Sequence, residues 1–201
     1  MNAVTAPHET LQGYYALHSR IYDATRWSFL FGRDAVIHRA AGFIRPQSIL
    51  EVGCGTGRNL NVLRSTFPEA SITGLDLSAD MLRIAKQRTH GVQLVQRAYD
   101  TPAGGFDLIL CSYALSMFNP GWERAIETAA ADLNPGGIIA VVDFSHTGTK
   151  WFETWMQRNH VRMQGHLWPL LRQHFITLSD TRHPSYFGLW HYGIHIGRKR
   201  P

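Results

Sequence analysis

The sequence has few cysteines and no long apolar run. Only Cys54 and Cys111 occur among the 201 residues, and each lies at the end of an apolar stretch. Two thiols are too few for a disulfide framework, so we expect two reduced core side chains and no metal site. No window approaches the roughly 20 consecutive apolar residues that a transmembrane helix needs.

The N-terminus lacks the features of a secretion signal. Residues 1–7 show no basic start followed by an apolar stretch, so we expect a cytoplasmic protein. Internal repeats and low-complexity tracts are also missing. We therefore expect one domain covering residues 1–201, a length that allows a substantial core.

Positive charge is concentrated at the two ends of the chain. Residues 46–149 carry seven Arg and Lys against ten Asp and Glu, whereas residues 150–201 carry eight against two. Residues 1–45 carry five arginines and three acids, and seven of the 11 histidines follow residue 145. Such flanks favour an anionic partner, either a membrane or a nucleic acid, or they form a solvated face that has no partner.

The most informative segment is glycine-rich. Residues 49–57 read Ile-Leu-Glu-Val-Gly-Cys-Gly-Thr-Gly, which predicts a buried strand, then a loop that a ligand can approach closely, then a helix. A second apolar run ends at Asp76, whose carboxylate can accept both hydroxyls of a ribose. A dinucleotide fingerprint would require a glycine where Arg58 stands. The segment therefore indicates a nucleotide-sized site that does not take NAD.

Strands alternate with helices along the middle of the chain, which predicts a doubly wound parallel sheet. After the first strand we expect strands at 71–76, 92–95, 106–111 and 137–144, and helices from 59 to about 67, at 79–88 behind a Ser78 cap, and at 122–133. Before this core we expect two helices within 8–44, and after it a helix at 150–166. Two late strands, at 174–179 and 189–196, would be joined by a long loop containing His183 and Pro184.

The spacing Glu51-x-Gly53-x-Gly55-x-Gly57, followed by Asp76, resembles the S-adenosylmethionine (AdoMet) loop of class I methyltransferases. The resemblance implies a Rossmann-like α/β fold, with a seven-stranded, mostly parallel sheet, helices on both faces and an N-terminal helical lid. It implies a lid in residues 1–45, a cofactor-binding core in 46–146, and a C-terminal helix with two strands in 147–201. AdoMet would then be the methyl donor and S-adenosylhomocysteine the product.

The same resemblance implies which residues hold the donor. Glu51 would reach its amino group through water, and Thr56 or Asn59 would hydrogen-bond its amino-acid end. Many relatives place an acid beside the adenine where this chain has Arg97, which cannot accept a hydrogen bond, so backbone groups at Ala98 are expected to recognise the adenine. The cofactor-binding candidates are Glu51, Gly53, Cys54, Gly55, Gly57, Asn59, Asp76, Leu77, Met81, Arg97, Ala98, Ser112 and Tyr113.

Three further segments resemble the betaine-lipid N-methyltransferases. They are the aromatic and arginine-rich residues 14–33, the Ser-Tyr-Ala-Leu-Ser-Met run at 112–117, and the Val-Asp-Phe run at 142–144. Those enzymes convert diacylglycerylhomoserine to its trimethylated betaine form with three AdoMet molecules. The resemblance spans Tyr14 to about Trp155. It implies successive methylation of a homoserine amino group on a glycerolipid, reached by peripheral contact with an anionic inner membrane face.

That chemistry suggests roles for aromatic and basic residues. Methyl transfer needs a neutral amine in line with the methyl carbon, so positioning supplies most of the acceleration. Aromatic faces stabilise the sulfonium and a methylated amine. A base at the carboxyl edge of the sheet, such as His146, would take the proton of an ammonium substrate. The catalytic candidates are Tyr22, Tyr113 and His146, and the substrate-binding candidates are Tyr14, Tyr15, Arg26, Trp27 and Arg33.

Each of these candidates has a simpler structural explanation. The aromatic residues would also suit the core face of an amphipathic helix, the arginines a solvated surface, and His146 an ordinary loop. The aromatic residues of 150–166 (Trp151, Phe152, Trp155 and Met156, with Arg158 and Arg162) suit either a helix at an anionic bilayer or packing onto the sheet.

Two other functions remain open. One is a methyltransferase for a soluble small molecule, and the other is a nucleotide- or RNA-binding module without turnover. After the fourth strand, residues 112–120 lack the [Asn/Asp]-Pro-Pro-aromatic motif common in DNA and RNA amino-methyltransferases. A nucleic-acid partner is therefore not expected, and the oligomeric state stays open.

Overall fold

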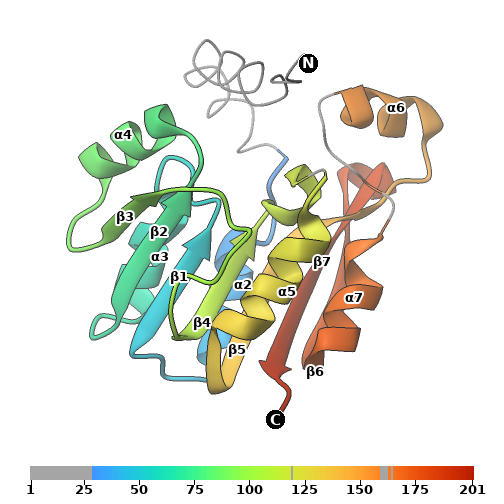
Figure 1. Cartoon of the computed structure of the whole chain (residues 1–201). Helices are drawn as coiled ribbons and strands as arrows, with labels where there is room; N and C mark the ends of the chain where they lie inside the picture. Colours follow the sequence, from blue (N-terminus) through green and yellow to red (C-terminus); the bar gives the residue numbers. More distant parts are fainter. Residues whose placement is uncertain (1–28, 119, 159–162, 164) are drawn as a thin grey trace, which may run out of the picture.

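The computed structural model describes residues 29–118, 120–158, 163 and 165–201. In this part of the chain, seven strands form one sheet in the order β3-β2-β1-β4-β5-β7-β6, with helices on both faces (Figure 1). The strands are β1 (Ser48–Val52), β2 (Ser71–Asp76), β3 (Gln93–Gln96), β4 (Phe106–Ser112), β5 (Leu133–His146), β6 (Phe175–Ser185) and β7 (Trp190–Lys199). The helices are α2 (Arg33–Ala41), α3 (Arg58–Thr66), α4 (Ala79–Arg88), α5 (Trp122–Asp132), α6 (Lys150–Arg158) and α7 (Leu167–His174), with short 3₁₀ turns η1 (Leu115–Met117) and η2 (Tyr186–Gly188).

The first five strands are parallel, so their carboxyl ends lie at one edge of the sheet. β1 lies between β2 and β4 and pairs with both in parallel register. The chain moves outward from β1 to β3 on one side and from β4 to β5 on the other, so the direction of winding reverses between β1 and β4. Ligands of doubly wound sheets bind at such a reversal. The predicted Rossmann-like, seven-stranded, mostly parallel sheet is confirmed.

The core consists of two apolar layers, one on each face of the sheet. α2 and α3 bury Ile37 and Leu60 against one face, and α5 and α7 bury Ile126 and Leu171 against the other. In Figure 1, α5 and α7 lie in front of the sheet and α2 and α3 behind it. Both faces of the central strands are therefore covered, as their near-continuous apolar sequence requires.

Two sequence predictions near the C-terminus are wrong. The single helix predicted at 150–166 does not reach its predicted end: α6 is described over Lys150–Arg158, Met163 and Gly165 are not helical, and a separate helix, α7, begins at Leu167. Pro169 conceals α7 in the sequence but is tolerated in its first turn, where backbone N–H groups have no intrahelical acceptor. The loop predicted to contain His183 and Pro184 is instead part of β6, an edge strand that can accommodate a proline.

Of the two helices predicted within residues 8–44, one can be compared with the structure, which describes the chain from residue 29. α2 lies within the predicted helical region 8–44, and the other helix predicted there lies outside the described residues. In the ranges that the structure describes, no helix combines the length and the apolarity needed to cross a membrane.

Candidate functional site

The glycine loop follows β1 in the conformation that its sequence predicts. Gly53, Gly55 and Gly57 have φ values of 69°, 54° and 83°, a region that disfavours residues with a Cβ. A Cβ at Gly53 would come within 2.8 Å of Ala114, and one at Gly57 within 2.7 Å of Thr89. A Cβ at Gly55 would meet nothing within 4 Å. The outer two glycines thus permit close packing, while Gly55 borders open space.

Asp76 fixes this loop from the end of β2. Its Oδ2 accepts a hydrogen bond from the Gly55 amide at 2.8 Å, and its Oδ1 accepts one from the Ser78 amide at 2.9 Å. Ser78 in turn caps α4, because its Oγ accepts from the Met81 amide at 3.3 Å. One carboxylate therefore positions both the glycine loop and the start of the next helix. Leu77, between them, is exposed, whereas Met81 is buried.

Glu51 is a buried acid immediately before the glycine loop. Its Oε1 accepts a hydrogen bond from Asn59 Nδ2 at 2.8 Å, and its Oε2 is buried without a hydrogen-bond partner among the described residues. Burial raises the pKa of Glu51 to about 8. The negative charge of Asp76 raises this pKa further, whereas the hydrogen bond from Asn59 lowers it. A buried carboxylate oxygen that lacks a donor is suited to a cationic N–H donor.

The start of α2 lies beside the same loop. Arg58 forms an ion pair with Asp34 at 2.7 Å that joins the first turns of α3 and α2 and lowers the pKa of Asp34. Arg33, a substrate-binding candidate, donates from Nε to the Leu30 carbonyl at 3.1 Å. Its positive charge acts to lower the pKa of both Glu51 and Tyr113, so it is close to the site.

The loop after β3 is anchored by an acid that sequence reasoning missed. The buried Tyr99 hydroxyl donates to Asp132 Oδ2 at 2.9 Å, and the amides of Ala103 and Gly104 donate to Asp132 Oδ1 at 2.7 and 3.1 Å. The available signal was position: Asp132 interrupts the apolar face that α5 presents through Ala125 and Ala129.

The two adenine candidates lie within this anchored region. The Arg97 amide donates to the Asp76 carbonyl at 3.2 Å, and its guanidinium bonds the Thr101 carbonyl. Ala98 is exposed, so its backbone is available at the carboxyl edge.

Tyr113 follows β4 with a left-handed backbone, at φ 56°. Its hydroxyl donates to the Phe31 carbonyl at 2.8 Å, and its amide donates to the Val142 carbonyl at 2.8 Å. Burial raises the pKa of Tyr113 well above its ordinary value, so the phenol stays neutral. Its neighbour Ser112 has a buried Oγ without a partner in the described residues.

Tyr113 begins a row of seven aromatic rings that reaches the surface, here called the aromatic row. Successive ring centroids lie 4.7, 5.3, 5.9, 5.7, 5.9 and 6.4 Å apart. In order, the rings are those of Tyr113, Phe144, Trp190, Phe31, Tyr186, Phe29 and Trp155. The row connects the end of β4 with α6 and with the turn between β6 and β7.

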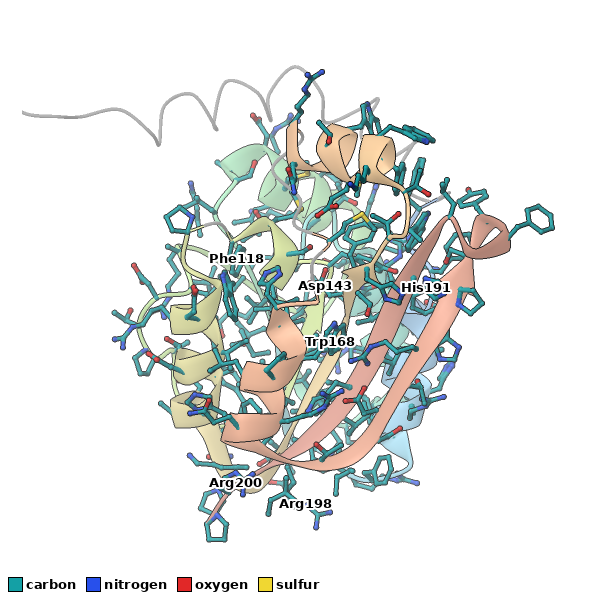
Figure 2. The ribbon with its side chains drawn as sticks, turned by 90° about the vertical axis from the view of Figure 1, so that its right-hand side faces the viewer. Phe118, Asp143, Trp168, His191, Arg198 and Arg200 are labelled. Atoms are coloured by element: carbon teal, nitrogen blue, oxygen red, sulfur yellow. The ribbon has the colours of Figure 1, made fainter. Side chains whose placement is uncertain are left out.

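Asp143 is a second acid that sequence reasoning did not assign to the site. It is fully buried in β5, where Oδ2 accepts from the Ser116 amide at 3.0 Å and Oδ1 from the Phe144 amide at 2.8 Å. Burial raises the pKa of Asp143 to about 6. Its effect is to hold η1, the turn that follows Tyr113. Figure 2 shows Asp143 near the same end of the sheet as Trp168 of α7 and His191 of β7.

His146 lies at the end of β5, exposed and stacked on His191 at 4.2 Å. Burial, the neighbouring His191 and Arg182 lower the pKa of His146, so its neutral form is favoured. Cys54 is buried beside Gly74, and burial raises the pKa of its thiol, which makes it a core side chain.

The remaining candidates lie outside the described residues. They are Tyr14, Tyr15, Tyr22, Arg26 and Trp27. The structure thus brings together the glycine loop, Glu51, Asn59, Asp76, Met81 and Arg33 at one point of the carboxyl edge.

Comparison with known proteins adds family relationships to this geometry. A family model described as a methyltransferase domain matches residues 23–190. The trans-aconitate 2-methyltransferase of Rhodopseudomonas palustris (strain BisB18) is 33% identical over 98 residues, which are 48% of this chain and 38% of that protein. The demethylmenaquinone methyltransferase of Tropheryma whipplei (strain Twist) is 33% identical over 137 residues, 64% of this chain and 56% of that protein. The chain thus spans less than two thirds of the length of either curated relative.

Among solved structures, the chain resembles the 1,6-didemethyltoxoflavin-N1-methyltransferase of Burkholderia thailandensis. The TM-score is 0.71 at 21% identity, over 100% of this chain and 93% of that one. That protein was crystallised with 1,6-didemethyltoxoflavin and S-adenosylhomocysteine. At this identity the likeness concerns the fold.

Proposed function

Because the chain belongs to the family defined by this methyltransferase domain, we propose that it transfers a methyl group from AdoMet to a small acceptor. One observation carries the proposal. The buried Glu51 Oε2 has no hydrogen-bond donor among the described residues, and Glu51 stands two residues before the first loop glycine and within electrostatic reach of Asp76, where the amino-acid end of AdoMet would bind. An ammonium group is the kind of donor this oxygen requires.

The residues present fit the whole donor molecule. Glu51 and Asn59 would hold the amino group, and the open space at Gly55 would admit the ligand close to the backbone. Asp76 would accept the ribose hydroxyls, and the anchored loop at Ala98 would border the adenine. When bound, AdoMet supplies a methyl group on a sulfonium.

The chain's own residues then orient the acceptor and exclude water. The part-exposed rings of the aromatic row (Phe31, Tyr186 and Trp155) offer faces that stabilise cationic groups near the carboxyl edge, and the buried rings of Tyr113, Phe144 and Trp190 pack behind them. His146, whose neutral form is favoured, is suited to receive a proton from an ammonium acceptor. Positioning is the main contribution, so no further base is needed.

A soluble small molecule is the acceptor class that the comparisons support best. Of the three similar proteins described above, two are named for the small molecules trans-aconitate and 1,6-didemethyltoxoflavin, and the third is named for demethylmenaquinone. A second candidate is the amino group of a homoserine-headed glycerolipid. It is favoured by the aromatic row, whose packed apolar rings extend from Tyr113 to the surface, and by the sequence resemblance to betaine-lipid enzymes.

Donor binding is tested by titrating S-adenosylhomocysteine into the protein in a calorimeter. Asp76→Ala should weaken binding at least tenfold, because it removes charge-assisted hydrogen bonds to the ribose worth about 1.5–3 kcal/mol each. Asp80→Ala is the matched control, since Asp80 lies four residues later on the exposed side of α4, paired only with Arg83 in the described structure. Equal affinity of Asp76→Ala and wild type would refute the ribose role.

The acceptor is tested with radiolabelled AdoMet. The protein is incubated with soluble amines and carboxylates in one reaction and with a lipid extract containing diacylglycerylhomoserine in another. Label in a soluble product supports the first candidate, and label in a lipid supports the second. Donor binding without label in any product would leave a binding module without turnover.

A further inference from the structure

Four large aromatic side chains are exposed at the carboxyl edge of the sheet, on two elements that are far apart in sequence. Trp151 and Trp155 of α6 are 66% and 48% exposed, Tyr186 of η2 is 45% exposed, and Phe187 beside it is fully exposed. Phe29 contacts both elements, with its ring 6.4 Å from Trp155 and 5.9 Å from Tyr186. We call these four side chains the aromatic patch. Its two elements lie at the same end of the molecule (Figure 1).

The sequence did not predict this combination. On α6, Phe152 and Met156 face the core, so the apolar residues of this helix divide between the sheet and the surface. η2 joins β6 to β7, where the sequence predicts a loop that begins before His183. The patch exists only because β6 extends to Ser185 and brings the turn beside α6.

The backbone of η2 is strained where it carries its aromatic residues. Tyr186 and Phe187 have φ values of 47° and 57°, a left-handed conformation that is costly for aromatic residues, whereas glycine and, to a lesser degree, asparagine adopt it. Phe187 gains no burial in return, because its side chain is fully exposed. Strain that packing does not offset points to a function of the side chain.

The residue types and charge around the patch fit a lipid surface. Trp, Tyr and Phe are the side chains that sit at the boundary between lipid headgroups and acyl chains. α6 begins with Lys150 and ends with Arg158, with one acid, Glu153, between them, and the turn beside it (residues 185–190) contains no Asp or Glu. Basic residues beside exposed aromatic ones favour an anionic bilayer over a neutral one.

Packed rings connect the patch with Tyr113, which follows β4 at the carboxyl edge of the sheet. The aromatic row runs from Trp155 and Tyr186 through Trp190 to Tyr113. Trp190 is completely buried, and its indole N–H has no hydrogen-bond partner among the described residues. A surface that holds the patch would therefore face the same edge at which the acceptor enters.

We infer that the aromatic patch docks the protein on an anionic lipid bilayer and turns the carboxyl edge of the sheet toward it. The inference deepens the proposed function, on which it rests, by naming the surface from which an acceptor is delivered. Docking itself needs no turnover and is measured separately.

The test is sedimentation with vesicles. Wild-type protein is mixed with vesicles of phosphatidylglycerol and phosphatidylcholine, or of phosphatidylcholine alone, at low and high salt. Binding is expected to the anionic vesicles and to fall as salt rises. The double variant Trp151→Ser, Phe187→Asn should bind the anionic vesicles at least about tenfold more weakly, because it removes two exposed aromatic side chains. Its fold should be unchanged, because asparagine tolerates the left-handed backbone at residue 187.

Matched controls come from the opposite edge of the sheet. Phe43 follows α2 and Ile176 is the second residue of β6, and they are 41% and 42% exposed. Phe43→Ser and Ile176→Ser should bind anionic vesicles as wild type does. An equal loss in these controls, or full binding by the double variant, overturns the inference, as does absence of wild-type binding. Dimerisation without lipid that depends on Phe187 also overturns it, because the patch would then contact a second copy.

The two proposals can fail independently. Calorimetry with S-adenosylhomocysteine on the same double variant should match wild type, because neither residue lies at the glycine loop. Donor binding without vesicle binding refutes the docking surface alone. Vesicle binding without donor binding refutes the proposed function while leaving the docking surface in place.

Discussion

At the scale of single residues, two carboxylates 25 positions apart have different tasks. Asp76 already accepts hydrogen bonds from two backbone amides, which stabilise its charged form and fix the glycine loop. Glu51 has a hydrogen-bond donor for only one of its two carboxylate oxygens among the described residues, and its side chain is almost completely buried. Because burial disfavours its charge, Glu51 holds a proton in the free protein at neutral pH.

This difference predicts that the protein releases a proton when AdoMet or S-adenosylhomocysteine binds. Glu51 has a pKa of about 8 in the free protein, and an ammonium partner requires the carboxylate, so binding at pH 7 should release close to one proton. Affinity for S-adenosylhomocysteine should accordingly rise as the pH increases from 6 to 8. Calorimetry at pH 7 in two buffers of different ionisation enthalpy measures the release. Glu51→Gln should release almost none, and equal release by both proteins would contradict the role of Glu51.

The glycine loop predicts a contrast between two similar substitutions. Gly55→Ala places its methyl group in open space and should cost about 1 kcal/mol of unfolding free energy, from the left-handed backbone alone. Gly57→Ala adds a clash with Thr89 at 2.7 Å and should cost about 2–4 kcal/mol. Urea unfolding of the free proteins measures both.

For ligand affinity we expect the opposite order, with Gly55→Ala weakening binding more than Gly57→Ala does. Gly55→Ala is expected to weaken S-adenosylhomocysteine binding despite its milder effect on stability, because its methyl group would occupy the space left for the ligand. A Gly55→Ala variant that binds with wild-type affinity would show that the open space is not the donor site.

At the scale of elements, α5 fixes the shape of the loop after β3, which borders the proposed adenine end of the site. Asp132, the last residue of α5, accepts from the Tyr99 hydroxyl and from the amides of Ala103 and Gly104. The loop after β3 therefore takes its shape from a helix that lies beyond β4 in the chain.

Removal of this anchor should be costly. Asp132→Ala leaves a buried phenol and two amides without acceptors, so it should lower the unfolding free energy by about 2–4 kcal/mol. Tyr99→Phe removes one bond and should cost about 1 kcal/mol. Glu127→Ala, which removes only an exposed pair with Arg124, is the control and should change stability by less than about 0.5 kcal/mol. Equal values for Asp132→Ala and Glu127→Ala in urea unfolding would contradict the anchor.

The elements also show what the sequence can and cannot predict. The parallel core was predictable because its strands are continuous apolar runs that alternate with capped helices, as at Ser78. β6 was not, because an edge strand carries polar residues and a proline that normally mark a loop. In the site, the loop glycines and Asp76 were recognisable by spacing. Asp132 and Asp143 were not, because a single acid in an apolar run says nothing about the distant amides it will bind.

At the scale of the whole molecule, the site joins parts that are otherwise separate. The glycine loop, α2 and the loop after β3 meet at the carboxyl edge, and each is held by hydrogen bonds or ion pairs from another element. A ligand that contacts all of them should stabilise the folded state as a unit.

Donor binding should therefore raise the melting temperature. At 100 times its Kd, S-adenosylhomocysteine should add about 2.7 kcal/mol, which corresponds to roughly 5–10 °C for a domain of this size. Scanning calorimetry with and without ligand measures the shift. Asp76→Ala at the same ligand concentration should show a much smaller shift, and an equal shift would place the ligand elsewhere.

The reversed direction of β7 has a practical consequence. Because β7 runs antiparallel to β5, it begins at the carboxyl edge and carries the chain back across the sheet, so residue 201 lies at the far end from the glycine loop (Figure 1). A linker attached after Pro201 would hold the protein on a biosensor chip with its ligand-binding edge facing the flow. The same attachment would leave the aromatic patch accessible to vesicles passed over the chip.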